Sequence, residues 1–173
     1  MKKTLVIFAH PYLEYSSLNT ELIKVYDKFE HITFKDLYEE YPDFHIATFR
    51  ERKRIKDYER LIFHFPLIWF GLPPLLKLWI DEVFDMNWIT DANHPLQNKD
   101  AIIITTVGGK EESYEPEGIY GCSVSNLLNA LTLSLKVIGV EVKQTKIIYD
   151  ADELNKDQKH NIGESLKELL QMS

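Results

Sequence analysis

Short apolar runs alternate along the chain with longer stretches of helical periodicity. Four runs are apolar and rich in β-branched residues without polar alternation, which is typical of parallel strands buried on both faces. They span residues 4–9, 60–65, 101–106 and 142–149. A fifth run, residues 31–35, is less apolar and is expected to form an edge strand.

Three stretches between these runs, residues 18–29, 123–138 and 155–172, repeat apolar residues at the spacing of a helix face. Another helix is expected to begin at Pro73 and Pro74, because proline is favoured in the first helical turn. The positions expected to face inward are Leu22, Ile23, Tyr26, Phe29, Leu127, Leu128, Leu131, Leu135, Ile138, Leu166, Leu169 and Leu170.

Strands that alternate with helices predict an α/β fold, with a parallel sheet covered on both faces. Five strands favour the flavodoxin-like doubly wound order 2-1-3-4-5, with a ligand at the switch point between strands 1 and 3. No linker or repeat divides the chain, so residues 1–173 are expected to form a single domain. Residues 85–100 form the longest irregular stretch, and such a loop is often functional.

Composition narrows the possible functions. The 173 residues are 45% hydrophobic and 27% charged, which is ordinary for a globular protein, and the net charge of −7 argues against a nucleic-acid surface. Residues 50–54 are basic apart from Glu51, and we expect the solvated face of a helix there. One cysteine, Cys122, excludes an internal disulfide, and the scattered histidines show no metal-ligand spacing. With neither a signal peptide nor a membrane-spanning run, a cytoplasmic protein is expected.

Three loops at the carboxyl ends of the predicted strands carry unusual chemistry. In residues 10–19, Ser16, Ser17 and Asn19 can donate hydrogen bonds to an anion beside free helix N–H groups, although simple helix capping would use the same residue types. Residues 66–71 place a Trp-Phe pair between a strand and a helix, which offers a flat apolar surface for a cofactor or merely an aromatic core corner. Residues 105–109 end in two glycines, which suit either an anion-holding backbone or an ordinary turn.

The motifs in these loops resemble those of the NAD(P)H:quinone oxidoreductases, which include the DT-diaphorases. The sequence Phe-Pro-Leu-Ile-Trp-Phe-Gly-Leu-Pro at residues 65–73, with Leu-Lys-Leu-Trp at 76–79, is similar to the flavin-contacting motif of that family. The segment from Leu37 to Phe44 and the helix from Pro73 resemble most closely the bacterial ancillary flavoproteins of glutathione-regulated potassium efflux.

The resemblance implies an FMN site, with FAD less expected because the short chain has no extension for an adenosine arm. The phosphate contacts implied are His10, Ser16, Ser17, Leu18 and Asn19. The contacts implied for the flavin ring are Pro66, Leu67, Ile68, Trp69, Phe70, Thr106, Val107, Gly108 and Gly109.

The family pattern continues with a tyrosine and a Gly-Ile-His-Gly segment. Tyr114 matches the tyrosine, whereas Tyr120 replaces the histidine, so a histidine-based charge relay is in doubt here. We expect Tyr114 and Tyr120 to be the catalytic side chains, on the acceptor side of the flavin.

The resemblance implies an NAD(P)H dehydrogenase (quinone) that takes hydride from NADPH or NADH and passes it to a quinone-like acceptor in a ping-pong reaction. It also implies a homodimer with active sites at the subunit interface, since Met86, Trp88 and Ile89 offer apolar groups that one domain leaves uncovered. Two alternatives stay open. One is a flavodoxin-type electron carrier, and the other is a regulatory subunit of a potassium-efflux transporter, peripheral at the inner face of the membrane.

Overall fold

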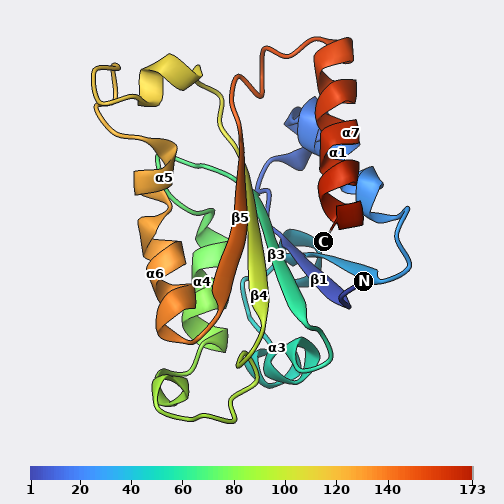
Figure 1. Cartoon of the computed structure of the whole chain (residues 1–173), viewed down its shortest axis with the longest axis vertical. Coiled ribbons are helices and arrows are strands. Elements are labelled where there is room, and N and C mark those ends of the chain that lie inside the picture. Colours follow the sequence, from blue (N-terminus) through green and yellow to red (C-terminus); the bar gives the residue numbers. More distant parts are fainter. Residues whose placement is uncertain (173) are drawn as a thin grey trace.

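The computed structural model describes residues 1–172, which form a five-stranded parallel sheet between two layers of helices (Figure 1). The strand order is β2-β1-β3-β4-β5, so the predicted flavodoxin-like topology is confirmed. The strands are β1 (Thr4–Phe8), β2 (Ile32–Asp36), β3 (Arg60–Pro66), β4 (Asp100–Thr106) and β5 (Glu141–Ile148).

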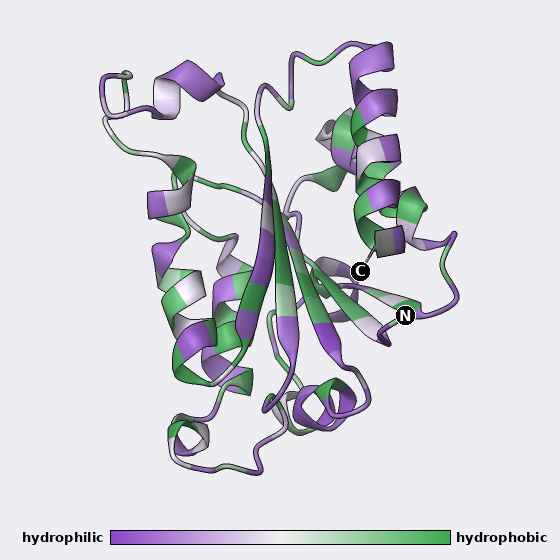
Figure 2. Ribbon diagram, in the orientation of Figure 1, coloured by the Kyte–Doolittle hydropathy of each residue, from purple (hydrophilic) through white to green (hydrophobic). Residues whose placement is uncertain are grey.

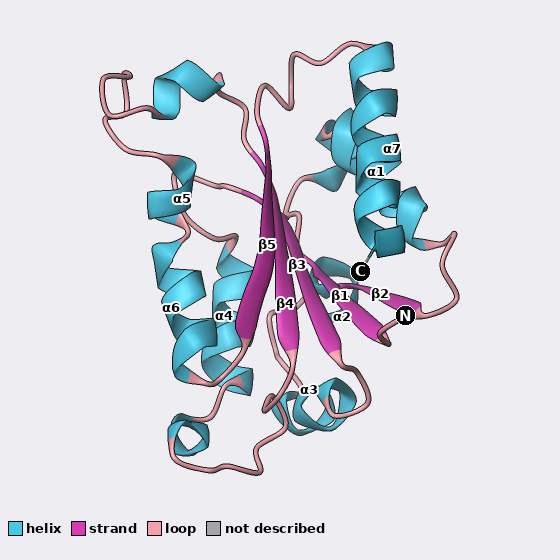
Figure 3. Cartoon of the chain, in the orientation of Figure 1, coloured by secondary structure: helices cyan, strands magenta, loops and turns pink. Residues whose placement is uncertain are grey.

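Helices cover both faces of the sheet (Figures 1 and 3). The first and last helices, α1 (Ser17–Tyr26) and α7 (Lys156–Met172), share one face. The other face carries α2 (Leu37–Glu40), α3 (Thr48–Ile55), α4 (Pro74–Val83), α5 (Val124–Leu127) and α6 (Asn129–Val137). Three short 3₁₀ helices are η1 (Leu13–Tyr15), η2 (Met86–Ile89) and η3 (Glu111–Tyr114).

The three central strands, β1, β3 and β4, are buried along their whole length, as their mainly apolar runs predict. Figure 2 shows apolar residues along most of these strands and hydrophilic residues where β3 and β4 begin. Because they run parallel and in register, Phe8, Pro66 and Thr106 end at one edge of the sheet. The loops that follow these strands therefore meet there. On α7, Leu166, Leu169 and Leu170 are buried as expected.

Two expected elements differ from the structure. The run 142–149 was expected to be a buried strand, but most side chains of β5 are exposed or half-exposed. Within residues 1–172, β5 pairs with β4 alone, at the edge position that the predicted strand order gives it. The single helix expected over 123–138 is two helices, since Leu128 takes φ −84° and ψ −4° between α5 and α6. Leu131, Leu135 and Ile138 still face the core.

The basic segment 50–54 is not simply a solvated helix face. Glu51 is buried, where its carboxylate accepts hydrogen bonds from the Tyr41 hydroxyl (2.5 Å) and Trp79 Nε1 (3.1 Å) and pairs with Arg54 Nη1 (2.8 Å). Arg54 lies one turn further along α3, but Tyr41 is the C-cap of α2 and Trp79 belongs to α4, so the proximity of these two could not be seen in a local pattern. Glu51 therefore ties three helical segments together.

The stretch 85–100 is partly ordered by η2, and Trp88 is buried rather than uncovered. Its ring stacks on His94 (centroids 5.7 Å apart) and lies under the Arg52 guanidinium (5.4 Å). Met86 and Ile89 do remain exposed, as expected.

Candidate active site

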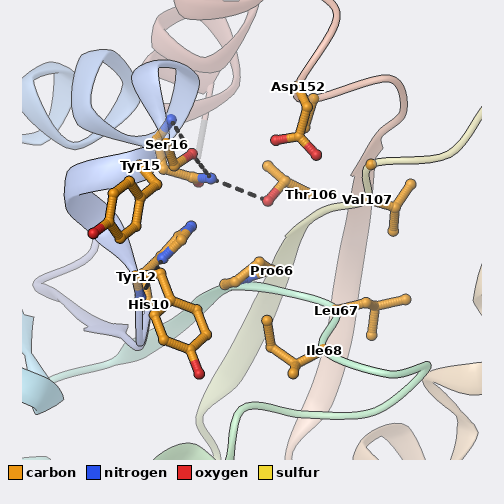
Figure 4. A pocket seen from close by; sticks show the side chains of 13 residues that line it. His10, Tyr12, Tyr15, Ser16, Pro66, Leu67, Ile68, Thr106, Val107 and Asp152 are labelled. Carbon is orange, nitrogen blue, oxygen red and sulfur yellow. Dashed lines mark hydrogen bonds between the residues drawn. The ribbon is translucent and has the colours of Figure 1, made fainter.

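The loops after β1, β3 and β4 enclose a pocket of about 230 Å³ at the carboxyl edge of the sheet (Figure 4). The predicted residues that line it are His10, Ser16, Asn19, Pro66, Leu67, Ile68, Thr106, Val107 and Gly108. Ligand pockets usually start at about 300 Å³. A larger ligand would therefore extend beyond this cavity over the neighbouring surface.

Ser16 caps α1 at the floor of the pocket. Its Oγ accepts hydrogen bonds from the Asn19 backbone N–H (3.3 Å) and from Asn19 Nδ2 (2.9 Å). Among residues 1–172, no acceptor is found for the backbone N–H groups of Ser17 and Leu18. Free N–H groups at a helix start are suited to an anion.

His10 stands at the side of this loop. Burial lowers the pKa of its imidazole below the usual value, an effect that Glu14 and Asp152 partly oppose. Its Nδ1 accepts a hydrogen bond from the Tyr12 N–H (3.2 Å), so the neutral ring carries its proton on Nε2. His10 can thus donate one hydrogen bond without being charged.

A buried hydrogen-bond network supports the pocket from below. The Asn19 side chain is almost fully buried and donates through Nδ2 to Thr106 Oγ1 (3.1 Å) as well as to Ser16. Its Oδ1 lies 3.0 Å from His64 Nε2, and His64 Nδ1 lies 2.8 Å from the Tyr26 hydroxyl. The network joins the loop after β1 to the end of β4. Asn19 therefore helps to fix the positions of Ser16 and Thr106, and it also lines the pocket itself.

Trp69 and Phe70 form the tip of a tight turn after β3, closed by the mutual backbone hydrogen bonds of Ile68 and Gly71 (2.9 and 3.0 Å). Both aromatic residues have positive φ, 46° and 64°, which bulky side chains rarely adopt. Trp69 is 92% exposed, so the alternative of an aromatic core corner is wrong. Strain of this kind concentrates at binding sites.

The loop after β4 brings Gly108 and Gly109 against other segments. A side chain at Gly108 would meet the Asp152 carboxylate at 2.7 Å, and one at Gly109 would meet the Tyr114 ring at 3.1 Å. The Tyr114 and Tyr120 rings lie 4.9 Å apart, and Tyr120 packs edge-on against Phe70 at 5.1 Å. Burial raises the pKa of Tyr114 further above its ordinary value of 10.0, so its phenol is protonated at neutral pH with a wide margin.

Seven predicted site residues do not line this cavity: Ser17, Leu18, Trp69, Phe70, Gly109, Tyr114 and Tyr120. They fall into two groups around it. Ser17 and the buried Leu18 sit at the start of α1. Phe70, Tyr114 and Tyr120 form an aromatic cluster with Gly109 packed against it, and the exposed Trp69 precedes Phe70 in the turn. Their contacts with a cofactor stay predictions.

Four lining residues were missed from the sequence: Tyr12, Tyr15, Ala151 and Asp152. The two tyrosines are in the loop after β1 and could have been included with it. Ala151 and Asp152 follow β5, and only the three-dimensional arrangement brings that loop to the pocket, where the Asp152 carboxylate points inward (Figure 4).

Comparison with known proteins identifies the family. A family model described as flavodoxin-like fold matches residues 2–172. The chain belongs to this flavodoxin-like family. Its membership confirms the relationship expected from the loop motifs.

Relatives of this flavodoxin-like chain carry informative names. It is 32% identical over 169 residues to the uncharacterised NAD(P)H oxidoreductase YrkL of Bacillus subtilis, covering 97% of both chains. It is 35% identical over 112 residues to the glutathione-regulated potassium-efflux system ancillary protein KefF of an Enterobacter species, covering 64% of both. The crystal structure of general stress protein 14 from Treponema denticola in complex with FMN has a TM-score of 0.87 and 26% identity, covering 98% of this chain and 97% of that one.

Proposed function

We propose that this chain is an FMN-dependent NAD(P)H oxidoreductase that reduces quinones or similar acceptors by two electrons. The proposal rests on one observation. The start of α1, with its free N–H groups, lies on one side of the pocket at the switch point of the sheet, and the strained turn at Trp69 and Phe70 lies on another. A phosphate and an aromatic ring system on one ligand match these two features. The names of the NAD(P)H oxidoreductase relative and the FMN complex support this assignment.

The residues present fit an FMN. The backbone N–H groups of Ser17 and Leu18 and the Nε2–H of His10 offer donors to the phosphate, while Leu67 and Ile68 offer an apolar wall to the ring. The close approach of Asp152 to Gly108 leaves a carboxylate in the wall of the pocket, where a sugar-alcohol chain could donate to it. FMN is proposed over FAD because the similar structure of general stress protein 14 is a complex with FMN. The whole chain would then serve as one flavin-binding domain.

Bound FMN would supply the redox chemistry, accepting hydride from NADPH or NADH and passing it to the acceptor. The protein's contribution is to position the reactants and exclude water. Trp69 and Phe70 would support the ring's edge, and the Gly108 and Gly109 amides would face the side of the ring where negative charge collects. Tyr114, protonated at neutral pH, can donate a hydrogen bond there.

The absorption spectrum of the purified protein tests the proposal directly. We expect a bound flavin that runs as FMN after heat release, is bleached anaerobically by NADPH or NADH and is reoxidised by a quinone. The absence of flavin after reconstitution would refute the assignment. Reduction by a protein donor alone would favour the carrier function instead.

We further propose that the protein is a homodimer. An apolar groove of about 380 Å³ lies between α4, η2 and α6, and four of its hydrophobic side chains are strongly exposed. They are Met86 (79%), Leu133 (57%), Val137 (54%) and Ile89 (45%). A second copy covering this groove would bury them, and a two-fold dimer is the commonest assembly. Light scattering at micromolar concentration should report twice the mass of the chain, and a fully active monomer would contradict this.

The relationship to KefF supports a second proposal, a transporter-bound role at the inner face of the membrane. No helix within residues 1–172 is long and apolar enough to cross a membrane. Co-purification of a potassium-efflux transporter from native membranes would support this role, and the two roles could coexist. Localisation in the cytoplasm follows from both.

A further inference from the structure

The last helix brings a positive charge to the loop at the start of the first helix. Lys159 lies in the first turn of α7, and its Nζ donates a hydrogen bond to Ser17 Oγ (2.7 Å), 142 residues earlier in the chain. Helices α1 and α7 pack side by side on the same face of the sheet (Figure 1), so the fold itself creates this contact. Lys159 is half-buried against them.

The other ionisable groups around this loop are poorly suited to a dianion. Glu14 and Asp152 are close enough to His10 to act on its pKa, and both are acidic. Burial holds His10 toward its neutral form. A phosphate monoester carries a charge of about −1.5 to −2 at neutral pH. Backbone N–H groups and a neutral imidazole alone would leave most of that charge uncompensated.

We propose that Lys159 is a phosphate-binding residue, and that its ammonium group makes the pocket select phosphorylated flavin over riboflavin. This inference rests on the proposed flavin function. Ser17 is the first residue of α1 and carries one of the free N–H groups, so an ammonium held at its Oγ lies beside the helix start at which the phosphate is proposed to bind. Lysine is well suited to pair with phosphate as a compact point charge.

The test compares FMN with riboflavin, which differ only in the phosphate. The full-length apoprotein is titrated with each flavin at low salt, and binding is followed by flavin fluorescence. Lys159→Gln should weaken FMN binding about tenfold, as a partly exposed charge-assisted hydrogen bond predicts, and should leave riboflavin binding within about twofold. Lys159→Arg should restore most of the FMN affinity, because it restores the charge.

Lys156→Gln is the matched control. It removes the same charge from the exposed start of the same helix, and should change FMN affinity by less than twofold. Added salt should weaken FMN binding to the wild type more than to Lys159→Gln, because screening acts on the charge pair.

Three results would each overturn the role of Lys159. The Lys159→Gln variant could lose FMN and riboflavin affinity equally, or keep its FMN affinity unchanged. Alternatively, Lys159→Gln and Lys156→Gln could weaken FMN binding equally. In those cases the wild type still binds flavin, and the proposed function stands. A wild type that binds neither flavin would overturn both.

Discussion

The buried network beneath the pocket makes a quantitative prediction about His64. This side chain has no exposed surface and contacts Asn19 Oδ1 and the Tyr26 hydroxyl through its two ring nitrogens. His64→Leu would leave both partners buried without a hydrogen bond. Each such group costs about 1–3 kcal/mol. Leucine fills most of the vacated volume, so we expect a loss of about 2–4 kcal/mol in the free energy of unfolding at pH 7.

The same residue also predicts how that loss changes with pH. Burial, with a smaller contribution from His10, lowers the pKa of His64 to about 3 in the folded protein. The unfolded chain binds a proton near pH 6.5, whereas the folded protein does not, so acidification below 6.5 favours unfolding. The slope approaches about 1.4 kcal/mol per pH unit. Between pH 7 and pH 5, His64 should therefore lower the free energy of unfolding of the wild type by about 2 kcal/mol.

The leucine variant lacks this proton site, so the stability gap between the two proteins should shrink by about 2 kcal/mol on going from pH 7 to pH 5. The comparison is needed because burial raises the pKa of Asp36 to about 6, which stabilises the fold as the pH falls toward 3.8. That effect is common to both proteins and cancels. Urea unfolding followed by circular dichroism measures the gap. The exposed His160→Leu serves as control, with a change within about 0.5 kcal/mol. A gap that stays constant with pH would refute the buried neutral imidazole.

Three further predictions concern the site and its support. Trp69→Ala should weaken FMN binding by about 1–3 kcal/mol. The free energy of unfolding should change little, because the Trp69 side chain is 92% exposed. Unchanged FMN affinity would show that Trp69 is not part of the site. Tyr114→Phe should slow flavin reduction in stopped-flow measurements, with a rise in activation free energy smaller than the roughly 2.7–4 kcal/mol lost with an oxyanion-hole donor. Tyr120→Phe should leave the rate nearly unchanged. Equal rates for wild type and Tyr114→Phe would mean that Tyr114 only lines the pocket. Glu51→Ala should lower the free energy of unfolding, measured in urea, by about 3–5 kcal/mol, because Tyr41, Trp79 and Arg54 lose a buried partner. A decrease as small as that of the control Glu39→Ala, at an exposed position, would contradict the buried cluster.

The sequence was informative where local pattern and tertiary environment coincide. The three central strands are buried on both faces, so continuous apolar runs located them and, with them, the three loops. The run around Val142 and Ile147 looks similar, yet most of β5 is exposed or half-exposed. The predicted order already placed this strand at the sheet edge, so an apolar run locates a strand but does not by itself show that both of its faces are covered.

Contacts between distant segments could not be predicted in the same way. Glu51 is buried beside Tyr41 and Trp79 from other helical segments, and only its i,i+3 partner Arg54 could be expected from spacing in the chain. Asp152 and Lys159 reach the pocket region from the loop after β5 and from α7. The nine-residue motif at 65–73 can be recognised in the sequence. The contact of Lys159 with Ser17, 142 positions earlier, can be seen only in the folded structure.

The span of the pocket along the chain has a consequence for synthesis in the cell. Its lining begins at His10 and ends at Asp152. A chain still emerging from the ribosome therefore contains the loop after β1 long before the lining residues Ala151 and Asp152 have been synthesised. Helix α7, which packs against α1, is made later still. Stable capture of the cofactor would then have to wait until translation is nearly complete. Chains truncated before β5 would carry a partial cradle and should fail to retain flavin, so cofactor content can report whether a chain was finished.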